Sequence, residues 1–428
     1  MQTSLWAIAK KSAKVKSHRF GNLFRLLNNE SLLWCWSFLN KKAAPGIDRV
    51  TANEYAQNLH VNIATLAAKV KTKRYHAKLV RRQYIPKSNG KLRPLGIPAT
   101  DDKVLQMAVA KILEAIYEQD FLGCSFGYRP KLGPMAAVKL LDQQLYTGRF
   151  YYIVEADIQD FFGTLDHDQL LNMLQLRLAD AAFLGLIAKW LKAGIMDTDG
   201  KILSPAAGTP QGSIVSPVLS NIYLHHVLDC WFYQTIVPRC RGAALLCRYA
   251  DDFVCAFQCK EDAQRFYQEL GNRLTAFGLK LAPDKTRLLS FSRYQQRSSS
   301  FVFLGFEFYW GKSRHGRPQL FRRTASKKLH NSIANFTTWV KENRHLQLRE
   351  LFTILNSKLR GYYNYYGVRG NYQRLNLFFY LAVNILFKWL NRRSQRKSFT
   401  WATFQVILNY YKIQRPRIVE KVVHPVPL

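Results

Sequence analysis

The order of hydrophobic and polar residues along the chain predicts a mixture of helices and strands. Between Asp101 and Tyr117, apolar residues recur at every third or fourth position, which predicts a helix with one face in the core. Helical spacing also covers residues 51–70, 215–228 and 261–277 and the chain from Ser326 onward. Runs rich in β-branched and aromatic residues predict strands at 150–154 and 301–306, and residues 279–289 are also predicted to form a strand. The expected fold class is therefore α/β, of the α+β kind.

Two tight hairpins are predicted, and each has charged residues near its turn. In the first, Asn89-Gly90 marks the turn, and the surrounding cations include Lys87 and Arg93. This basic hairpin is suited to hold phosphate, with a solvated basic loop as the alternative. In the second, Tyr249-Ala250-Asp251-Asp252 lies between two apolar runs, so neighbouring carboxylates are expected at the tip of the hairpin.

The adjacent carboxylates Asp251 and Asp252 are unfavourable to bring together in a folded protein. Like charges on neighbouring residues raise each other's pKa unless a cation neutralises them. Oxygen ligands of this kind suit Mg²⁺ better than a transition metal. The pair therefore indicates a metal-dependent phosphoryl-transfer site. An ordinary solvated turn is the alternative, because Asp is common in turns.

A third carboxylate, Asp157, follows the predicted strand at 150–154. Two-metal nucleotidyl transfer needs carboxylates from separate elements, because they must bracket two ions that lie about 4 Å apart. Asp157 can meet Asp251 and Asp252 in this way if the strands that carry them are neighbours in one sheet.

Composition makes an extended polyanion the expected partner. The 428 residues include 63 Lys and Arg against 28 Asp and Glu, so the net charge is +35, far more than solubility requires. An anionic membrane is the competing partner, but the apolar stretch from Phe378 to Phe387 is too short to cross a bilayer. The N-terminus lacks the charge order of a secretory signal, and no Cys-x-x-Cys pair occurs. A cytoplasmic protein with reduced thiols and no membrane partner is expected.

The positive charge is concentrated towards the C-terminus. Residues 311–428 hold 23 Lys and Arg but only three acidic residues, and they are rich in aromatic side chains. Residues 1–310 mix acidic residues with apolar strands. The first 310 residues therefore suit an active site, and the remainder suits nucleic-acid binding.

Seven short motifs resemble, in order, those of the reverse transcriptases encoded by bacterial group II introns, which also act as maturases. They are residues 44–48 (APGID), 91–98 (KLRPLGIP), 125–130 (SFGYRP), Asp157 with Phe161-Phe162, 209–212 (TPQG), 249–252 (YADD) and 303–306 (FLGF). Further likeness at 361–366, 389–394 and 400–401 extends the resemblance to nearly the whole chain. One such motif is weak evidence, whereas seven in order are specific.

This resemblance implies a right-hand polymerase with fingers, palm and a helical thumb. Residues 1–149 would form an N-terminal extension and the fingers with parts of the palm, 150–310 the palm, and 311–428 the thumb and maturase region. Asp157, Asp251 and Asp252 would be the catalytic ligands of two Mg²⁺ ions. Nucleotide-binding roles would fall to Lys87, Arg93, Phe162, Gln211 and Lys285, and RNA-binding roles to Tyr365, Tyr366, Arg392 and Arg393.

The implied nucleotide roles differ from residue to residue. Lys87 and Arg93 would bind the incoming triphosphate, and Phe162 would exclude a ribose 2′-hydroxyl. Gln211 would lie beneath the nascent base pair, and Lys285, on the predicted strand 279–289, would lie near the leaving phosphate. Three alternatives stay open: Phe162 and the tyrosines at 362–366 as core residues, and Lys285 as an ordinary exposed lysine.

We therefore expect an RNA-directed DNA polymerase that extends a primer with deoxynucleotides on an RNA template. It would also bind structured intron RNA to assist splicing and retrohoming. The alternatives are a domesticated relative in phage defence or DNA repair, and an RNA-binding splicing factor without polymerase activity. Because no Cys pair follows Cys259, the zinc-bearing nuclease domain of longer family members is not expected. Purified protein with its RNA should then show no protein-dependent cutting of intact duplex DNA.

Overall fold

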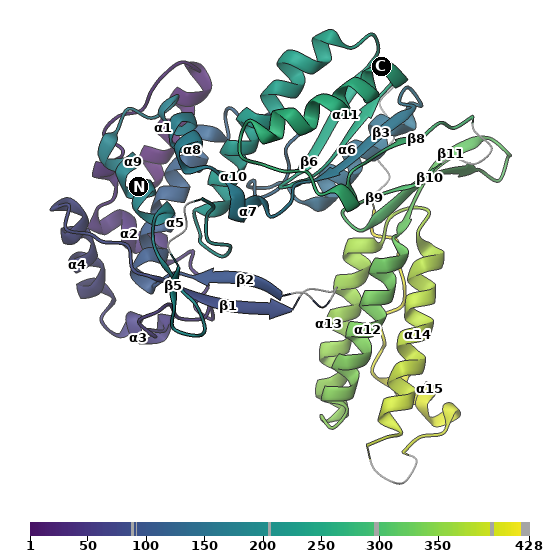
Figure 1. Cartoon of the computed structure of the whole chain (residues 1–428). Coiled ribbons are helices and arrows are strands. Elements are labelled where there is room, and N and C mark those ends of the chain that lie inside the picture. Colours follow the sequence, from purple (N-terminus) through teal and green to yellow (C-terminus); the bar gives the residue numbers. More distant parts are fainter. Residues whose placement is uncertain (87–89, 91, 204–206, 295–298, 394–397, 421–428) are drawn as a thin grey trace. The chain divides into compact units, whose positions relative to one another are not determined.

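The chain packs into two compact units in the computed structural model, which describes residues 1–86, 90, 92–203, 207–294, 299–393 and 398–420. Unit 1 comprises Met1–Leu140 and Tyr152–Leu288, and unit 2 comprises Leu141–Tyr151 and Leu289–Leu428 (Figure 1). The division into fingers, palm and thumb at 149/150 and 310/311 stays a prediction. Its second boundary falls within strand β10 (Phe306–Lys312).

Helices form most of the N-terminal part of unit 1. The predicted helix over residues 101–117 is present as α5 (Thr100–Tyr117), and its buried face includes Val104, Ile112 and Ile116. Helices α1 (Gln2–Lys14), α2 (Asn29–Trp36) and α10 (Ser216–Leu224) contact α5. The other helices of this part are α3 (Ala52–Gln57), α4 (Leu59–Lys71), α7 (Phe161–Thr164), α8 (His167–Gln175) and α9 (Ala181–Leu191).

The sheet with the candidate carboxylates has the strand order β6-β7-β3-β8. Its strands are β6 (Ala244–Tyr249), β7 (Asp252–Phe257), β3 (Tyr152–Asp157) and β8 (Arg287–Ser290). β7 is antiparallel to both β6 and β3, so the expected pairing of the two carboxylate-bearing strands is confirmed. Helix α11 (Lys260–Thr275) packs against β3 and β7, and the ring of its Phe266 lies 5.2 Å from that of Phe257.

A second sheet of unit 1 contains the basic hairpin. Its strand order is β2-β1-β4-β5, formed by β2 (Leu92–Ile97), β1 (Val80–Pro86), β4 (Ile195–Met196) and β5 (Ile202–Leu203). Antiparallel pairing of Pro86 with Leu92 confirms the predicted hairpin. Lys87 lies outside the described residues, as does Asn89 of the turn.

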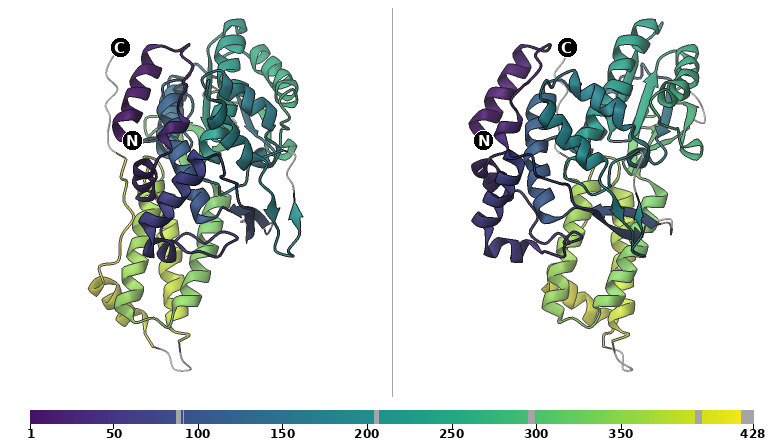
Figure 2. Two further views of the ribbon diagram at one scale, coloured as in Figure 1. Left: turned by 90° about the vertical axis from the view of Figure 1, so that its left-hand side faces the viewer. Right: turned by 60° about the vertical axis from the view of Figure 1, so that its left-hand side comes forward.

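Unit 2 combines a three-stranded sheet with a group of helices. Strands β9 (Phe301–Phe303), β10 and β11 (Pro318–Thr324) pair in the order β11-β10-β9. The helices predicted after Ser326 are α12 (Ser326–Asn343), α13 (Leu348–Tyr366), α14 (Tyr372–Leu390) and α15 (Trp401–Tyr410). Figures 1 and 2 show α12, α13 and α14 side by side, and Phe336, Phe352 and Phe378 from these helices belong to one core.

Several shorter elements complete the fold. α6 (Pro134–Tyr146) contains the boundary between the two units. Two π-helical turns, η2 (His225–Asp229) and η3 (Phe232–Ile236), follow α10, and the 3-10 turns are η1 (Phe24–Leu26), η4 (Val237–Arg239) and η5 (Pro283–Lys285). Among the helices that the structure describes, none is long and apolar enough to cross a bilayer.

Candidate active site

The register of the β3–β7 pair brings the three candidate carboxylates to one end of the sheet. Asp157, the last residue of β3, is paired directly with Asp252, the first residue of β7. Directly opposed residues of antiparallel strands project from the same face. Asp251 lies in the two-residue turn between β6 and β7, beside Ala250, whose φ is +57°. Residues almost a hundred positions apart thus form one acidic group, as the sequence predicted.

In the acidic group formed by Asp157, Asp251 and Asp252, burial and neighbouring negative charges make ionisation of Asp251 and Asp252 unfavourable. Burial raises the pKa of Asp252 to about 7, and the negative charges of Asp157 and Asp251 add to the rise. Burial also raises the pKa of Asp251, which the charge of Arg93 partly opposes. Both shifts mean that ionised carboxylates are unfavourable here unless positive charge is supplied. A divalent cation would supply it.

Lys285 supplies part of that positive charge. Its Nζ lies 2.5 Å from Oδ2 of Asp157, and this hydrogen bond is the main reason why the pKa of Lys285 is raised. The prediction that Lys285 lies on a strand is wrong. It ends the 3-10 turn η5, and β8 begins two residues later. Pro283 opens that turn because its fixed φ suits the start of a helical turn.

The donor set fits a hard divalent cation in its chemistry. The acidic group offers carboxylate oxygens without sulfur or imidazole, which is the ligand type that Mg²⁺ prefers. As the side chains stand, however, no three His, Cys, Asp or Glu residues of the described part of the chain are close enough together to hold a metal ion. Asp157 is paired with Lys285 instead. The assignment of metal ligands therefore stays a proposal.

Phe162 and Gln211 line one cavity of about 280 Å³ in unit 1. The loop at 208–211 is tied to the segment of Phe162, because the Thr209 amide donates to the Phe162 carbonyl at 2.7 Å. Gly208 has a φ of +89°, and a Cβ there would lie 2.7 Å from the same carbonyl oxygen, so this approach requires glycine. Phe162 and Gln211, two of the residues that the resemblance places around the nucleotide, are thus brought together.

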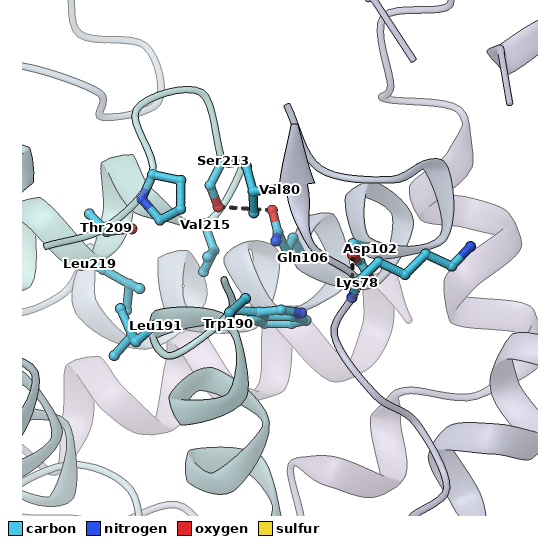
Figure 3. A pocket seen from close by; sticks show the side chains of 12 residues that line it. Lys78, Val80, Asp102, Gln106, Trp190, Leu191, Thr209, Ser213, Val215 and Leu219 are labelled. Atoms are coloured by element: carbon cyan, nitrogen blue, oxygen red, sulfur yellow. Dashed lines mark hydrogen bonds between the residues drawn. The ribbon is translucent and has the colours of Figure 1, made fainter. Parts of the chain in front are cut away.

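Hydrogen bonds on both sides fix the loop that carries Gln211. The Gln211 carbonyl accepts the Gly96 amide of β2 at 2.6 Å. On the other side, Oε1 of the buried Gln106 accepts the Ser213 hydroxyl at 2.9 Å (Figure 3). The same oxygen accepts the Ile214 amide at 3.1 Å. The cavity drawn in Figure 3 has a volume of about 10 Å³, room for at most one water molecule, so we assign no substrate to it.

Tyr128 is a site residue to which the sequence assigned no role. It has a φ of +57° and is about half exposed. Its ring meets that of Phe162 edge to face, with 6.5 Å between centroids. Burial and the charge of Asp251 raise the pKa of its hydroxyl. Tyr128 belongs to the SFGYRP motif, and this was the sequence signal that could have identified it as a site residue. No local pattern shows which residue its ring contacts.

The predicted RNA-binding residues lie in unit 2, and each has a contact within the protein, which for Arg392 is a cation–π contact with Trp389. Tyr365 stacks on Phe306 and donates its hydroxyl to the Leu304 carbonyl at 2.8 Å. Tyr366 packs against the same phenylalanine. Nη2 of Arg393 donates to the Leu346 carbonyl at 2.9 Å, whereas Arg392 is exposed. Their role in RNA binding stays a prediction, and of the two arginines Arg392 is the more exposed.

Comparison with known proteins agrees with this geometry. Residues 85–308 match the family model described as reverse transcriptase (RNA-dependent DNA polymerase). Protein YkfC of Escherichia coli (strain K12) is 32% identical over 70% of this chain and 85% of that protein. Group II intron-encoded protein LtrA of Lactococcus lactis subsp. cremoris is 30% identical over 87% of this chain and 75% of that protein. The putative COX1/OXI3 intron 2 protein of Saccharomyces cerevisiae is 28% identical over 54% of this chain and 25% of that protein.

The family match covers the sheet that pairs Asp157 with Asp252, so the class of protein is a nucleotide polymerase. The chain belongs to the reverse transcriptase family, with the right-hand polymerase fold that its motifs predicted. It is an RNA-directed DNA polymerase, a class of enzyme that uses divalent metal ions and acts on nucleic acid. The predicted resemblance to group II intron-encoded proteins is confirmed. Neither alternative is favoured, whether a domesticated relative in phage defence or DNA repair or an RNA-binding splicing factor without polymerase activity.

Proposed function

We propose that this polymerase copies an RNA template with two Mg²⁺ ions held by Asp157, Asp251 and Asp252, and that it also binds group II intron RNA. The supporting observation is the direct pairing of Asp157 with Asp252, beside a turn whose carboxylate also has a raised pKa. Bound Mg²⁺ would lower the pKa of the primer 3′-hydroxyl and neutralise charge on the leaving pyrophosphate.

The chain's own residues would bind and orient the nucleotide. Arg93 and Lys87, on the basic hairpin, would neutralise the triphosphate. Phe162 would occupy the space that a ribose 2′-hydroxyl needs, and Gln211, which lines the same cavity, would support the base pair. Lys285 would exchange its contact with Asp157 for one with a phosphate oxygen, since its side chain is two-thirds exposed.

Chelation should abolish DNA synthesis reversibly. With EDTA in excess, we expect no extension of a DNA primer on an RNA template, because the acidic group then lacks its counter-charge. Adding Mg²⁺ back in excess should restore the rate, as measured by primer extension on a sequencing gel. Ca²⁺ at equal ionic strength is the control and should not restore it. Undiminished synthesis in EDTA would contradict the metal-dependent assignment.

Intron RNA is the proposed structured partner, bound to assist splicing and retrohoming. Two observations support this. The names of similar proteins refer to a group II intron and to an intron of COX1/OXI3, and the net charge of residues 311–428 is +20, from 23 basic and three acidic residues. Clustered cations release counterions from a nucleic acid, so affinity falls steeply with salt.

Neutralising exposed cations of unit 2 should weaken RNA binding and flatten its salt dependence. Lys388 and Arg392 are both exposed. The double variant Lys388→Gln with Arg392→Gln should make the negative slope of log affinity against log salt shallower by about 1.4. Filter binding with a group II intron RNA at several salt concentrations measures this. The matched control is Arg241→Gln with Lys260→Gln, two exposed cations of unit 1. If the control variant loses as much of the slope, the cations that bind RNA are spread over both units and are not concentrated in unit 2.

We further propose that the protein acts in the bacterial cytoplasm. All seven cysteines are free thiols in the structure, and reduced thiols are typical of that compartment.

A further inference from the structure

Arg248, the residue before the YADD motif, is completely buried. Its Nε and Nη2 donate to the two carboxylate oxygens of Asp229 at 2.7 and 2.6 Å. Nη2 also donates to the Ser125 hydroxyl at 2.7 Å. Nη1 donates to Oδ1 of Asn221 and to the Ala250 carbonyl, each at 3.1 Å. All five N–H groups of the guanidinium are therefore used.

The bond to the Ala250 carbonyl acts directly on the catalytic turn. Ala250 precedes Asp251, and its φ of +57° is one that residues other than glycine rarely adopt. Such a conformation persists only where the surroundings impose it. A charged donor on the Ala250 carbonyl is one such constraint, and charge-assisted hydrogen bonds are stronger than neutral ones.

The second constraint on this turn is the chain segment at 124–128. The Arg248 amide donates to the Cys124 carbonyl at 2.8 Å, and the Phe126 amide donates to the Arg248 carbonyl at 2.9 Å. These bonds bring Gly127 against the turn, so that a Cβ on Gly127 would lie 2.4 Å from the Ala250 nitrogen. Nδ2 of Asn221 holds Gly127 in place through a 2.6 Å bond to its carbonyl.

The same segment also contacts Phe162, the residue proposed to exclude a ribose 2′-hydroxyl. Tyr128 follows Gly127 and makes the edge-to-face contact with Phe162. The guanidinium of Arg248 thus bonds both to the turn that carries Asp251 and, through Ser125, to the segment that carries Tyr128 of the aromatic pair. Asn221 comes from α10, and Asp229 comes from the π-helical turn η2.

We propose that Arg248 is a positioning residue of the polymerase site, which fixes the Ala250–Asp251 turn and the segment 125–128 relative to each other. This inference rests on the proposed catalytic role of Asp251 and Asp252. Arg248 does not touch a reacting group. It acts through the Ala250 carbonyl, the Ser125 hydroxyl and Asn221, with Asp229 neutralising its charge.

Unit 1 contains a second arginine of the same type that provides a control. Nη1 of Arg177 lies 2.7 Å from both carboxylate oxygens of Asp120, and its Nη2 donates to the hydroxyl of the buried Ser12 at 2.6 Å. Ser12→Ala and Ser125→Ala therefore each remove one short hydroxyl contact from a buried, carboxylate-paired arginine. Only Ser125 belongs to the segment beside the catalytic turn.

The experiment compares kcat and the dNTP KM of Ser125→Ala with those of Ser12→Ala in primer extension on an RNA template, at matched folded fractions from thermal melts. We expect Ser12→Ala to lower the melting temperature at least as much as Ser125→Ala, because the Ser12 hydroxyl also donates to the Ile116 carbonyl. Ser125→Ala should lower kcat about 10-fold with less than 3-fold change in KM, whereas Ser12→Ala should leave both unchanged. Equal kcat in the two variants would overturn the proposal.

Gly127→Ala is the second variant, with Gly123→Ala as its control. A Cβ on Gly127 meets the Ala250 backbone, whereas a Cβ on Gly123 meets nothing within 4 Å. We expect at least a 100-fold lower kcat for Gly127→Ala and wild-type kcat for Gly123→Ala. If Gly127→Ala does not fold, the serine pair decides. If the wild-type protein is active and loses activity on substitution of Asp251 but not of Ser125 or Gly127, the positioning role alone is refuted. If the wild-type protein is inactive, the proposed function is refuted.

Discussion

Asp252→Asn should abolish DNA synthesis while leaving the protein folded. We expect kcat to fall by about 10³-fold or more, because the amide keeps the shape of the carboxylate but loses the charge that neutralises a bound cation. The fold should be at least as stable as wild type in metal-free buffer. The carboxylate it replaces is buried among like charges that raise its pKa to about 7. Single-turnover primer extension and thermal melts measure the two quantities.

Asp284→Asn is the matched control for this loss. Asp284 is exposed in η5, next to Lys285, and has no part in the acidic group. It should retain wild-type kcat. Extension at the wild-type rate by Asp252→Asn, or by the double variant Asp251→Ala with Asp252→Ala, would show that these carboxylates are not the catalytic ligands.

Phe162→Ala should relax the choice between deoxynucleotides and ribonucleotides. We expect the ratio of kcat/KM for dNTP over rNTP to fall by about 10²-fold, since a 2′-hydroxyl would enter the space that the ring vacates. Phe162 is placed for this role because it lines the cavity that Gln211 also lines, and its ring is steadied by Tyr128. Single-nucleotide incorporation with matched dNTP and rNTP measures the ratio.

Its neighbour Phe161 provides the control. Phe161 is buried in the core beside Tyr223, so Phe161→Leu should lower stability through lost packing but leave sugar discrimination unchanged. If Phe162→Ala changes melting temperature but not the dNTP to rNTP ratio, Phe162 is a packing residue, which is the alternative that its sequence left open.

Local patterns predicted most of the secondary structure because helices and hairpins depend on near neighbours. The spacing in α5 and the run of helices from α12 onward follow directly from apolar periodicity. Lys285 shows where this fails. Residues 279–289 are predicted to form a strand, but Pro283 opens a 3-10 turn, and the strand is confined to Arg287–Ser290.

The residues around the carboxylates were less accessible to sequence reasoning than the carboxylates themselves. Arg248 lies in a hydrophobic strand, and no local sequence feature identifies its hydrogen-bond partners. These partners come from positions 125, 221, 229 and 250. Tyr128 likewise meets Phe162 only through folding. Such contacts depend on how distant segments pack, and one sequence contains no local signal for them.

The sequence by itself determined the excess of positive charge, the adjacent carboxylates at a hairpin tip and the order of seven motifs. These properties are local or additive along the chain. Only the tertiary structure decided that β3 lies beside β7 in a register that opposes Asp157 to Asp252, and that Arg248 is buried behind their turn. A one-residue slip in that register would turn Asp157 to the other face of the sheet. The register depends on packing against α11 and the rest of the core, which is a property of the whole fold.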